Sequence, residues 1–337
     1  MSKRFLAAAC AAATALALSA CSSAPSSEGN ASKDGTLTVM ASFYPLQYLA
    51  EKIGGEHVTV TSLTPAGAEP HDLELSPKTV DALASADAVV YLAGFQAAVD
   101  EAIEQQAPTT VIDVSPAVEL VEANSSANHP SEDEDADEAQ SGESATEEHA
   151  DHDHEGHDHE GHHHDMSADP HFWLDPVRMA SAATLVGDKL AEADPANADT
   201  YKANAQALNE ELSALGDDLV AKTATCQIKT FVTAHTAFGY LADRTGLTQV
   251  GISGLDPDSS PSPARLAEIS QIAKDQGVTT IFTEALIDPK VAQTLADDLG
   301  ISTAVLDPIE SQTDSSKDYA AVMKDNINAL TTANNCQ

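Results

Sequence analysis

The chain has 337 residues, with 54 aspartates and glutamates against 16 lysines and arginines, so its formal net charge is −38. This length is enough for two domains of ordinary size. So negative a charge argues against a nucleic-acid partner, because phosphate groups would be repelled, and it favours the attraction of cations.

The first residues have the pattern of a secretory signal over residues 1–20, because two basic residues precede a small apolar run that ends at Leu18. This run is too short and too rich in alanine to span a membrane well. The sequence Leu-Ser-Ala-Cys that ends at Cys21 is typical of a bacterial lipobox, which predicts cleavage before this cysteine and lipidation of its thiol. The alternative is an ordinary signal with a chance cysteine. With residues 22–35 as a small, polar tether, we expect an exported protein that is anchored by lipid to the outer face of the cell membrane.

The segment 36–121 is predicted to form a first α/β lobe. Ser76 and Pro77 have the residue types of a helix N-cap and first turn. Strands are expected near residues 36–41, 58–63, 88–93 and 110–114, and helices near 43–53, from 77 onward and 96–106. Because strands that alternate with helices form parallel sheets, this lobe should contain one.

The segment 122–168 is acidic and rich in histidine. Residues 122–167 hold nine of the thirteen histidines, sixteen carboxylates and no lysine or arginine. They lack the apolar side chains that would offset ordering entropy, so we predict a disordered loop that collects divalent cations weakly. The alternative is a solvated acidic linker without a role. The expected weak auxiliary ligands are His149, His152, His154, His157, His159, His162, His163 and His164.

The pattern of residues 169–337 predicts a helical connection followed by a second lobe. Residues 169–193 should form an ordered return and a helix, and residues 194–223 a long connecting helix with one apolar stripe. Residues 224–337 repeat the α/β pattern, with strands near 229–234, 248–251, 279–283 and 302–306 and helices near 263–276, 289–299 and 316–332. The predicted fold is therefore two similar parallel-sheet α/β lobes joined by a long rigid helix, with a metal site in the cleft between them.

The cysteines predict one disulfide. Cys10 would leave with the signal and Cys21 would carry lipid, which leaves Cys226 and Cys336. Two remaining thiols in an exported chain suggest a bridge between them. It would fasten the C-terminal tail to the start of the second lobe.

Four residues outside the acidic segment form a candidate metal site. His71, His235 and Glu284 each follow a predicted strand, and His171 lies at the ordered edge of the acidic segment. In open α/β sheets, ligands bind beyond the carboxyl ends of the strands. Three imidazoles and one carboxylate form a near-tetrahedral set that suits zinc, whereas manganese or calcium would need more oxygen ligands. Glu69 or water could take the fourth position instead, and His57 is interpreted as a surface residue.

Several motifs resemble the substrate-binding lipoproteins of bacterial zinc and manganese ABC importers, and the zinc branch in particular. The resemblance covers residues 36–333. It rests on FYPL at 43–46, GAEPHD at 67–72, DPHFWLDP at 169–176, AHTAFGY at 234–240, FTE at 282–284 and VLDP at 305–308. It implies that His71, His171 and His235 bind the metal, and that two lobes on one long helix move only slightly. The zinc branch also often carries a histidine- and acid-rich loop ahead of the second ligand.

The resemblance implies extracytoplasmic capture of zinc and its delivery to a membrane permease and ATPase by a monomeric binding protein. The alternatives are an importer component for manganese or iron, and a surface metal buffer or adhesin. A zinc hydrolase is disfavoured, because no HExxH motif occurs outside the histidine-rich acidic segment and the chain has no nucleophile motif.

Overall fold

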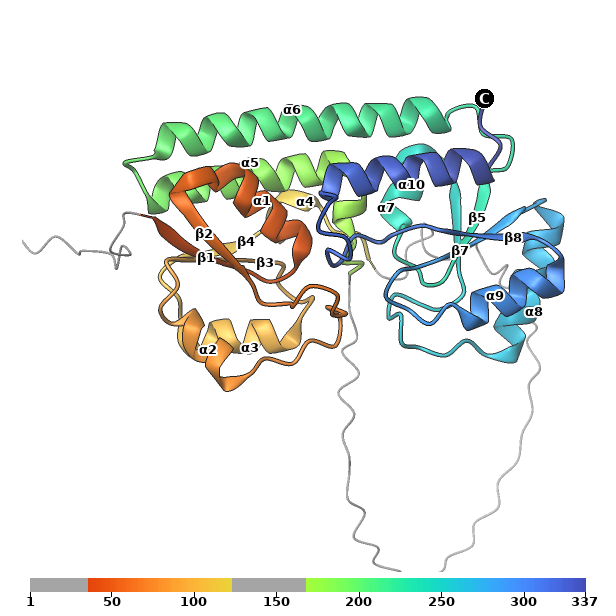
Figure 1. Cartoon of the computed structure of the whole chain (residues 1–337), viewed down its shortest axis with the longest axis horizontal. Coiled ribbons are helices and arrows are strands. Elements are labelled where there is room, and N and C mark those ends of the chain that lie inside the picture. The colour runs from red at the N-terminus through yellow and green to blue at the C-terminus, as the bar shows by residue number, and fades with distance from the viewer. Residues whose placement is uncertain (1–35, 123–167) are drawn as a thin grey trace, which may run out of the picture.

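The computed structural model describes residues 36–122 and 168–337 and contains two four-stranded parallel sheets, one in each lobe (Figure 1). The predictions for the signal, the lipobox at Cys21, the tether and the eight auxiliary histidines lie outside the described residues. No helix within the described ranges is long and apolar enough to cross a membrane.

The first lobe is built on the sheet β2-β1-β3-β4. Its two central strands are almost fully buried, as expected of strands with helices on both faces. The register places Leu37 beside Val58 and Val39 beside Ala88. Its elements are β1 (Leu37–Ala41), α1 (Tyr44–Gly54), η1 (Gly55–His57), β2 (Val58–Ser62), α2 (Pro77–Leu83), β3 (Ala88–Tyr91), α3 (Ala97–Gln106), β4 (Val111–Asp113) and α4 (Ser115–Val118).

The second lobe repeats this topology in the sheet β6-β5-β7-β8. Its elements are β5 (Thr230–Thr233), α7 (Gly239–Thr245), β6 (Thr248–Gly251), α8 (Pro263–Asp275), β7 (Thr280–Thr283), α9 (Lys290–Leu299), β8 (Ser302–Val305) and α10 (Tyr319–Ala333). In both lobes the first strand in sequence lies between the second and the third. The prediction of two similar parallel-sheet lobes is therefore confirmed.

Two antiparallel helices connect the lobes. The chain passes from η2 (Phe172–Leu174) into α5 (Pro176–Ala193) and α6 (Ala198–Thr223). Helix α6 runs along the top of both lobes in Figure 1 and contacts α1 of the first lobe and α7 and α10 of the second. Close packing of α5 on α6 requires Gly187, because a Cβ atom there would lie 2.3 Å from Cβ of Ala205.

One apolar core extends through both lobes. Its central side chain is Trp173, which is completely buried and packs edge-on against Phe43 with ring centroids 4.8 Å apart. The same cluster includes Phe282 of the second sheet and Met323 of α10. Trp173 also donates a hydrogen bond from Nε1 to the carbonyl oxygen of Pro308 over 2.7 Å. The lobes therefore share buried contacts and not merely a linker.

The structure joins Cys226 and Cys336 in a disulfide, as predicted. The bridge spans 110 residues and fastens the C-terminal tail beside the start of β5. In the loop-entropy model, a closed loop of this length stabilises the fold by about 5 kcal/mol. Asn334 adds a hydrogen bond from Nδ2 to the carbonyl oxygen of Ile228 over 2.9 Å.

The two ends of the acidic segment lie side by side. Glu122 and Ala168 form an antiparallel bridge, and the amide of Asp169 donates to the carbonyl oxygen of Val121 over 2.9 Å. The hydroxyl of Tyr240 accepts from the amide of Val121 and donates to the carbonyl oxygen of Asp169. The segment therefore leaves and re-enters the described structure at one point.

Candidate metal centre

His71 lies on the loop between β2 and α2, and this loop is held by both lobes. The amide of Gly67 donates to Oγ of Ser311 over 2.7 Å, and Nε2 of Gln96 donates to the carbonyl oxygen of Pro70 over 3.1 Å. The ring of His71 packs edge-on against Phe95, with centroids 4.9 Å apart. These contacts direct its imidazole toward the second lobe.

His171 directly precedes η2 and is completely buried. Oδ1 of Asp169 lies 3.0 Å from the main-chain nitrogen of His171 and 2.8 Å from its ring Nδ1. Because a carboxylate only accepts hydrogen bonds, Nδ1 carries a proton and Nε2 is the ring nitrogen available to a metal. Nε2 is the atom that faces the other candidate ligands.

His235 lies two residues beyond the end of β5, and Glu284 directly follows the neighbouring strand β7. Glu284 accepts from the main-chain amide of His235 at Oε1 over 3.1 Å and from ring Nδ1 at Oε2 over 2.7 Å. The carboxyl ends of adjacent parallel strands therefore bring these residues together, as the sequence predicts. Nε2 of His235 points away from Glu284 into the site.

Glu310 belongs to the loop after β8, and its carboxylate lies beside the three histidines as the fourth member of the cluster. The residue before it, Ile309, has φ of 57°, a left-handed conformation that β-branched residues rarely adopt. The amide of Ile309 donates to Oδ1 of Asp307 over 2.8 Å, and the Trp173 indole donates to Pro308. This restrained turn directs Glu310 inward, where its side chain is only 3% exposed.

The structure brings His71, His171, His235 and Glu310 together. Their ligand atoms all lie within 4.8 Å of one another. Oε1 of Glu310 is 3.5, 3.2 and 3.4 Å from Nε2 of His71, His171 and His235, and the Nε2 atoms of His71 and His171 are 3.3 Å apart. A tetrahedral zinc ion with bonds of roughly 2.0–2.1 Å separates its ligand atoms by about 3.3 Å.

Two buried atoms of this cluster lack hydrogen bonds within the part of the chain that the structure describes, as expected of atoms that bind a cation. Nε2 of His235 and Oε1 of Glu310 have no hydrogen-bond partner among the described residues. A buried polar atom without a partner is costly, and these two atoms lie only 3.4 Å apart. A cation at their centre would satisfy both.

Glu284 requires a correction, because the structure does not place it in this group. Its two oxygens accept from the main-chain amide and from ring Nδ1 of His235. Because Nε2 lies on the opposite edge of the ring, the carboxylate does not face the ion that Nε2 would hold. Glu69, the competing carboxylate, lies 4.0 Å from Nε2 of His71 and accepts from the amides of His71 and Asp72 instead. His57 is far from the site, in η1, with its ring packed on Tyr201.

The carboxylates raise the proton affinity of two of the imidazoles. Burial lowers the pKa of His171, but the hydrogen bond to Asp169 and the negative charges of Asp169 and Glu310 outweigh it and raise the pKa above its usual value. For His235, the effects of Glu284 and Glu310 exceed that of burial in the same way and raise the pKa to about 10. Burial would raise the pKa of Glu310, yet the three histidines hold it well below its usual range. Protons and metal therefore compete for the same nitrogens.

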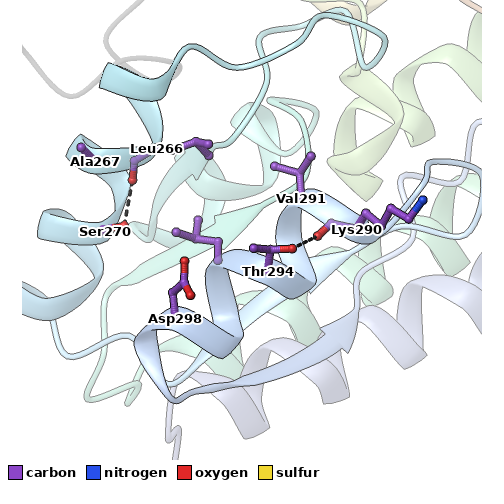
Figure 2. A pocket seen from close by; sticks show the side chains of 8 residues that line it. Leu266, Ala267, Ser270, Lys290, Val291, Thr294 and Asp298 are labelled. Carbon is purple, nitrogen blue, oxygen red and sulfur yellow. Dashed lines mark hydrogen bonds between the residues drawn. The ribbon is translucent and has the colours of Figure 1, made fainter.

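A groove on the second lobe lies apart from this centre. It has a volume of 380 Å³ and runs between α8 and α9, and Figure 2 shows Leu266 and Val291 among the apolar side chains that line it. Among its lining residues only Lys290 and Asp298 are charged. Its chemistry offers no set of metal ligands, so the buried cluster is the candidate functional site.

Two sheet-based lobes with a buried cluster of three imidazoles and one carboxylate between them indicate a two-lobed metal-binding protein. A family model described as zinc-uptake complex component A, periplasmic, matches residues 39–333. The chain belongs to this family. Because its members are components of an uptake complex, the prediction that the chain is not an enzyme is confirmed.

The relatives agree with this assignment. The zinc-binding protein AdcA of Streptococcus pyogenes is 33% identical over 312 residues, which cover 88% of this chain and 56% of AdcA. The chain thus spans little more than half the length of such relatives. The high-affinity zinc uptake system protein ZnuA of Bacillus subtilis is 32% identical, with 94% of this chain and 93% of that protein covered.

Solved structures show the same architecture. The Zn(II)-bound ZnuA-like domain of Streptococcus pneumoniae AdcA is similar with a TM-score of 0.68 and 29% identity, covering 89% of this chain and 99% of that one. The laminin-binding protein Lmb of Streptococcus agalactiae, described as an adhesin with metal-transporting activity, has a TM-score of 0.72 and 28% identity, with 88% and 99% covered.

Proposed function

We propose that this protein captures Zn²⁺ outside the cytoplasm and delivers it to the permease and ATPase of an ABC importer. The observation that carries the proposal is the convergence of His71, His171, His235 and Glu310 between the lobes. The family and the zinc-binding names of the relatives support zinc as the cargo. The three motif histidines and Glu310 are the proposed ligands.

The donor set favours zinc over the alternatives that the sequence leaves open. Three imidazole nitrogens and one carboxylate suit a four-coordinate zinc ion, whereas manganese prefers more oxygen ligands and a larger coordination number. The ligands are almost completely buried, with side-chain exposure of 0–6%. Such enclosure excludes the additional water ligands that a six-coordinate ion needs.

Export and lipid anchoring complete the proposal. The sequence up to Cys21 has the pattern of a lipoprotein signal, and a relative in Streptococcus pneumoniae is named a zinc-binding lipoprotein. A lipid on Cys21 would hold the protein at the outer face of the membrane without a spanning helix. In this position it would act as a monomer that docks on the permease.

Metal analysis and competition test the proposal together. Protein purified without added metal should contain zinc, and a competitive titration should show a preference for Zn²⁺ over Mn²⁺ of at least about a hundredfold. The physical reason is the nitrogen-rich, four-coordinate donor set. Equal affinity for the two ions, or a preference for Mn²⁺, would contradict zinc as the cargo.

Zinc affinity should depend steeply on pH. The pKa of His235 is raised to about 10, so this imidazole carries protons on both ring nitrogens at neutral pH in the metal-free protein, and the raised pKa of His171 strengthens proton binding there too. Zinc must displace these protons, and the affinity should therefore rise with pH by up to about tenfold per unit for each proton displaced. Competition titrations at pH 6, 7 and 8 measure the slope. An affinity that does not change over this interval would contradict proton displacement.

Removal of the acidic segment should preserve the tight site. Because Glu122 and Ala168 are bridge partners, an Asn-Gly turn in place of residues 123–167 can join them as a two-residue hairpin. We expect this variant to keep one tight zinc ion and to lose only additional weak binding, which a titration of zinc stoichiometry measures. Loss of the tight site in a folded variant would mean that the segment supplies a ligand.

A further inference from the structure

We propose that Glu284 is a positioning residue that fixes the imidazole of His235 in the tautomer that can bind zinc. This inference rests on the proposed function, and it gives a role to a carboxylate that lies outside the ligand group. It depends on which oxygen of Glu284 contacts which nitrogen of His235.

Glu284 uses a different oxygen for each contact. Oε1 accepts from the main-chain amide of His235 over 3.1 Å, and Oε2 accepts from ring Nδ1 over 2.7 Å. Both side chains are buried, with exposures of 1% for Glu284 and 0% for His235. Since the Glu284 oxygens can only accept, Nδ1 must carry a proton, and Nε2, which faces Glu310, is the nitrogen left to bind a metal.

Hydrogen bonds from buried side chains hold the main chain of His235 in place. Its carbonyl oxygen accepts from Oγ1 of Thr233 over 2.7 Å and from Nε2 of Gln249 over 3.0 Å. Gln249 also donates to Thr233 over 2.8 Å, and both of these side chains are buried. The amide of His235 shares a peptide unit with the carbonyl oxygen of Ala234, which accepts from the amide of Ser253 over 2.8 Å, so this amide keeps its direction toward Glu284.

Asp169 supports His171 in a chemically different way. A single oxygen, Oδ1, accepts both from the main-chain amide of His171 over 3.0 Å and from ring Nδ1 over 2.8 Å. An asparagine in this position can keep both contacts with its one carbonyl oxygen. Asp169→Asn is therefore a matched control, because it removes a buried charge beside a ligand histidine without forcing a change of tautomer.

A glutamine in place of Glu284 cannot keep both contacts. If its oxygen accepts from the main chain, its amino group faces Nδ1, which must then accept a hydrogen bond, and the ring proton moves to Nε2. Nε2 would then be unable to bind zinc. If its oxygen instead accepts from Nδ1, its amino group opposes the main-chain N–H, and two buried donors face each other.

The three variants should follow an unusual order of zinc affinities. Glu284→Gln should weaken zinc binding by about a hundredfold, the upper part of the range for residues that orient metal ligands. Glu284→Ala should weaken it by only about tenfold, because alanine removes the support without imposing the wrong tautomer. Asp169→Asn should cost less than about tenfold. A role for Glu284 in packing alone predicts the reverse order, since glutamine fills the space and alanine does not.

The test measures zinc affinity by chelator competition in the full mature protein and its three variants. Nitrogen-detected NMR of the histidine rings in the zinc-loaded protein should show a protonated Nδ1 and a metal-bound Nε2 for His235. This signal should persist in Asp169→Asn and be lost in Glu284→Gln. The wild-type titration separately decides the proposed function, because a protein that does not bind zinc tightly refutes that function before any variant is compared.

Three results would overturn the positioning role while wild-type zinc binding stands. These are tighter binding by Glu284→Gln than by Glu284→Ala, a greater loss in Asp169→Asn than in Glu284→Gln, and zinc on Nδ1 of His235 in the wild type. If Glu284→Gln does not fold, the wild-type ring NMR still decides the inference, because a His235 without a proton on Nδ1 contradicts it.

Discussion

Replacing His171 or His235 with alanine should weaken zinc binding by about 10²–10³-fold. Structural zinc sites contribute roughly 10–16 kcal/mol over four ligands, so that one ligand accounts for about 3 kcal/mol or slightly more. Each replacement also leaves a buried carboxylate partner, Asp169 or Glu284, without its imidazole. His71→Ala should also lower the affinity strongly, because its Nε2 lies 3.5 Å from Glu310. Competition with a zinc-binding chromophore measures all three.

His57→Ala is the matched control for this series. His57 lies in η1, where its ring packs on Tyr201 of α6, and it does not belong to the ligand group. Its zinc affinity should stay within about threefold of wild type, the range of an ordinary surface substitution. Unchanged affinity in two of the three ligand variants, with folding verified by circular dichroism, would refute the site.

Replacing Glu310 with glutamine should also weaken zinc binding by about a hundredfold or more, because it removes the only anion among the four ligands. Glutamine has nearly the same shape, so the strained turn at Ile309 and the hydrogen bond from Trp173 to Pro308 should remain. The loss would therefore report charge and coordination. Calorimetry on protein stripped of metal measures the change.

Glu69→Gln provides the comparison for Glu310→Gln. Glu69 lies 4.0 Å from Nε2 of His71 but outside the ligand group, and its oxygens accept main-chain hydrogen bonds. Its zinc affinity should fall by less than about tenfold, as for a residue that supports the loop and does not bind the ion. A larger loss in Glu69→Gln than in Glu310→Gln would assign the fourth ligand position to Glu69.

Most of the fold could be predicted from the sequence, because local patterns and tertiary structure agree. Apolar runs that alternate with helical segments predict parallel sheets, and the structure contains strands and helices close to the predicted ranges in both lobes. Helix α6 begins at Ala198 and not at residue 194, since Asp194 and Pro195 first form a turn in which Asp194 accepts from Asn197. Such boundaries depend on side-chain contacts that periodicity does not report.

The candidate site was partly predictable for the same reason. His235 and Glu284 lie at the carboxyl ends of adjacent strands, and this rule correctly places them next to each other. The rule does not determine which side of the imidazole the carboxylate meets, so it cannot distinguish a metal ligand from a residue that supports one. Glu310 lies five residues beyond β8, after VLDP at 305–308, and its direction depends on the rare conformation of Ile309. The sequence signal for Glu310 is a carboxylate that stands two residues after the VLDP motif.

The unbroken core described above also determines how the fold can be divided. Trp173 belongs to a buried cluster that includes side chains from both sheets and from α10, and Cys336 is bonded back to Cys226 at the start of the second lobe. A cut between the lobes would expose this apolar surface on both fragments. Neither half is therefore a self-sufficient module, and melting should destroy both lobes and the ligand cluster in one cooperative event. Recombination between relatives would have to exchange the two lobes as a matched pair.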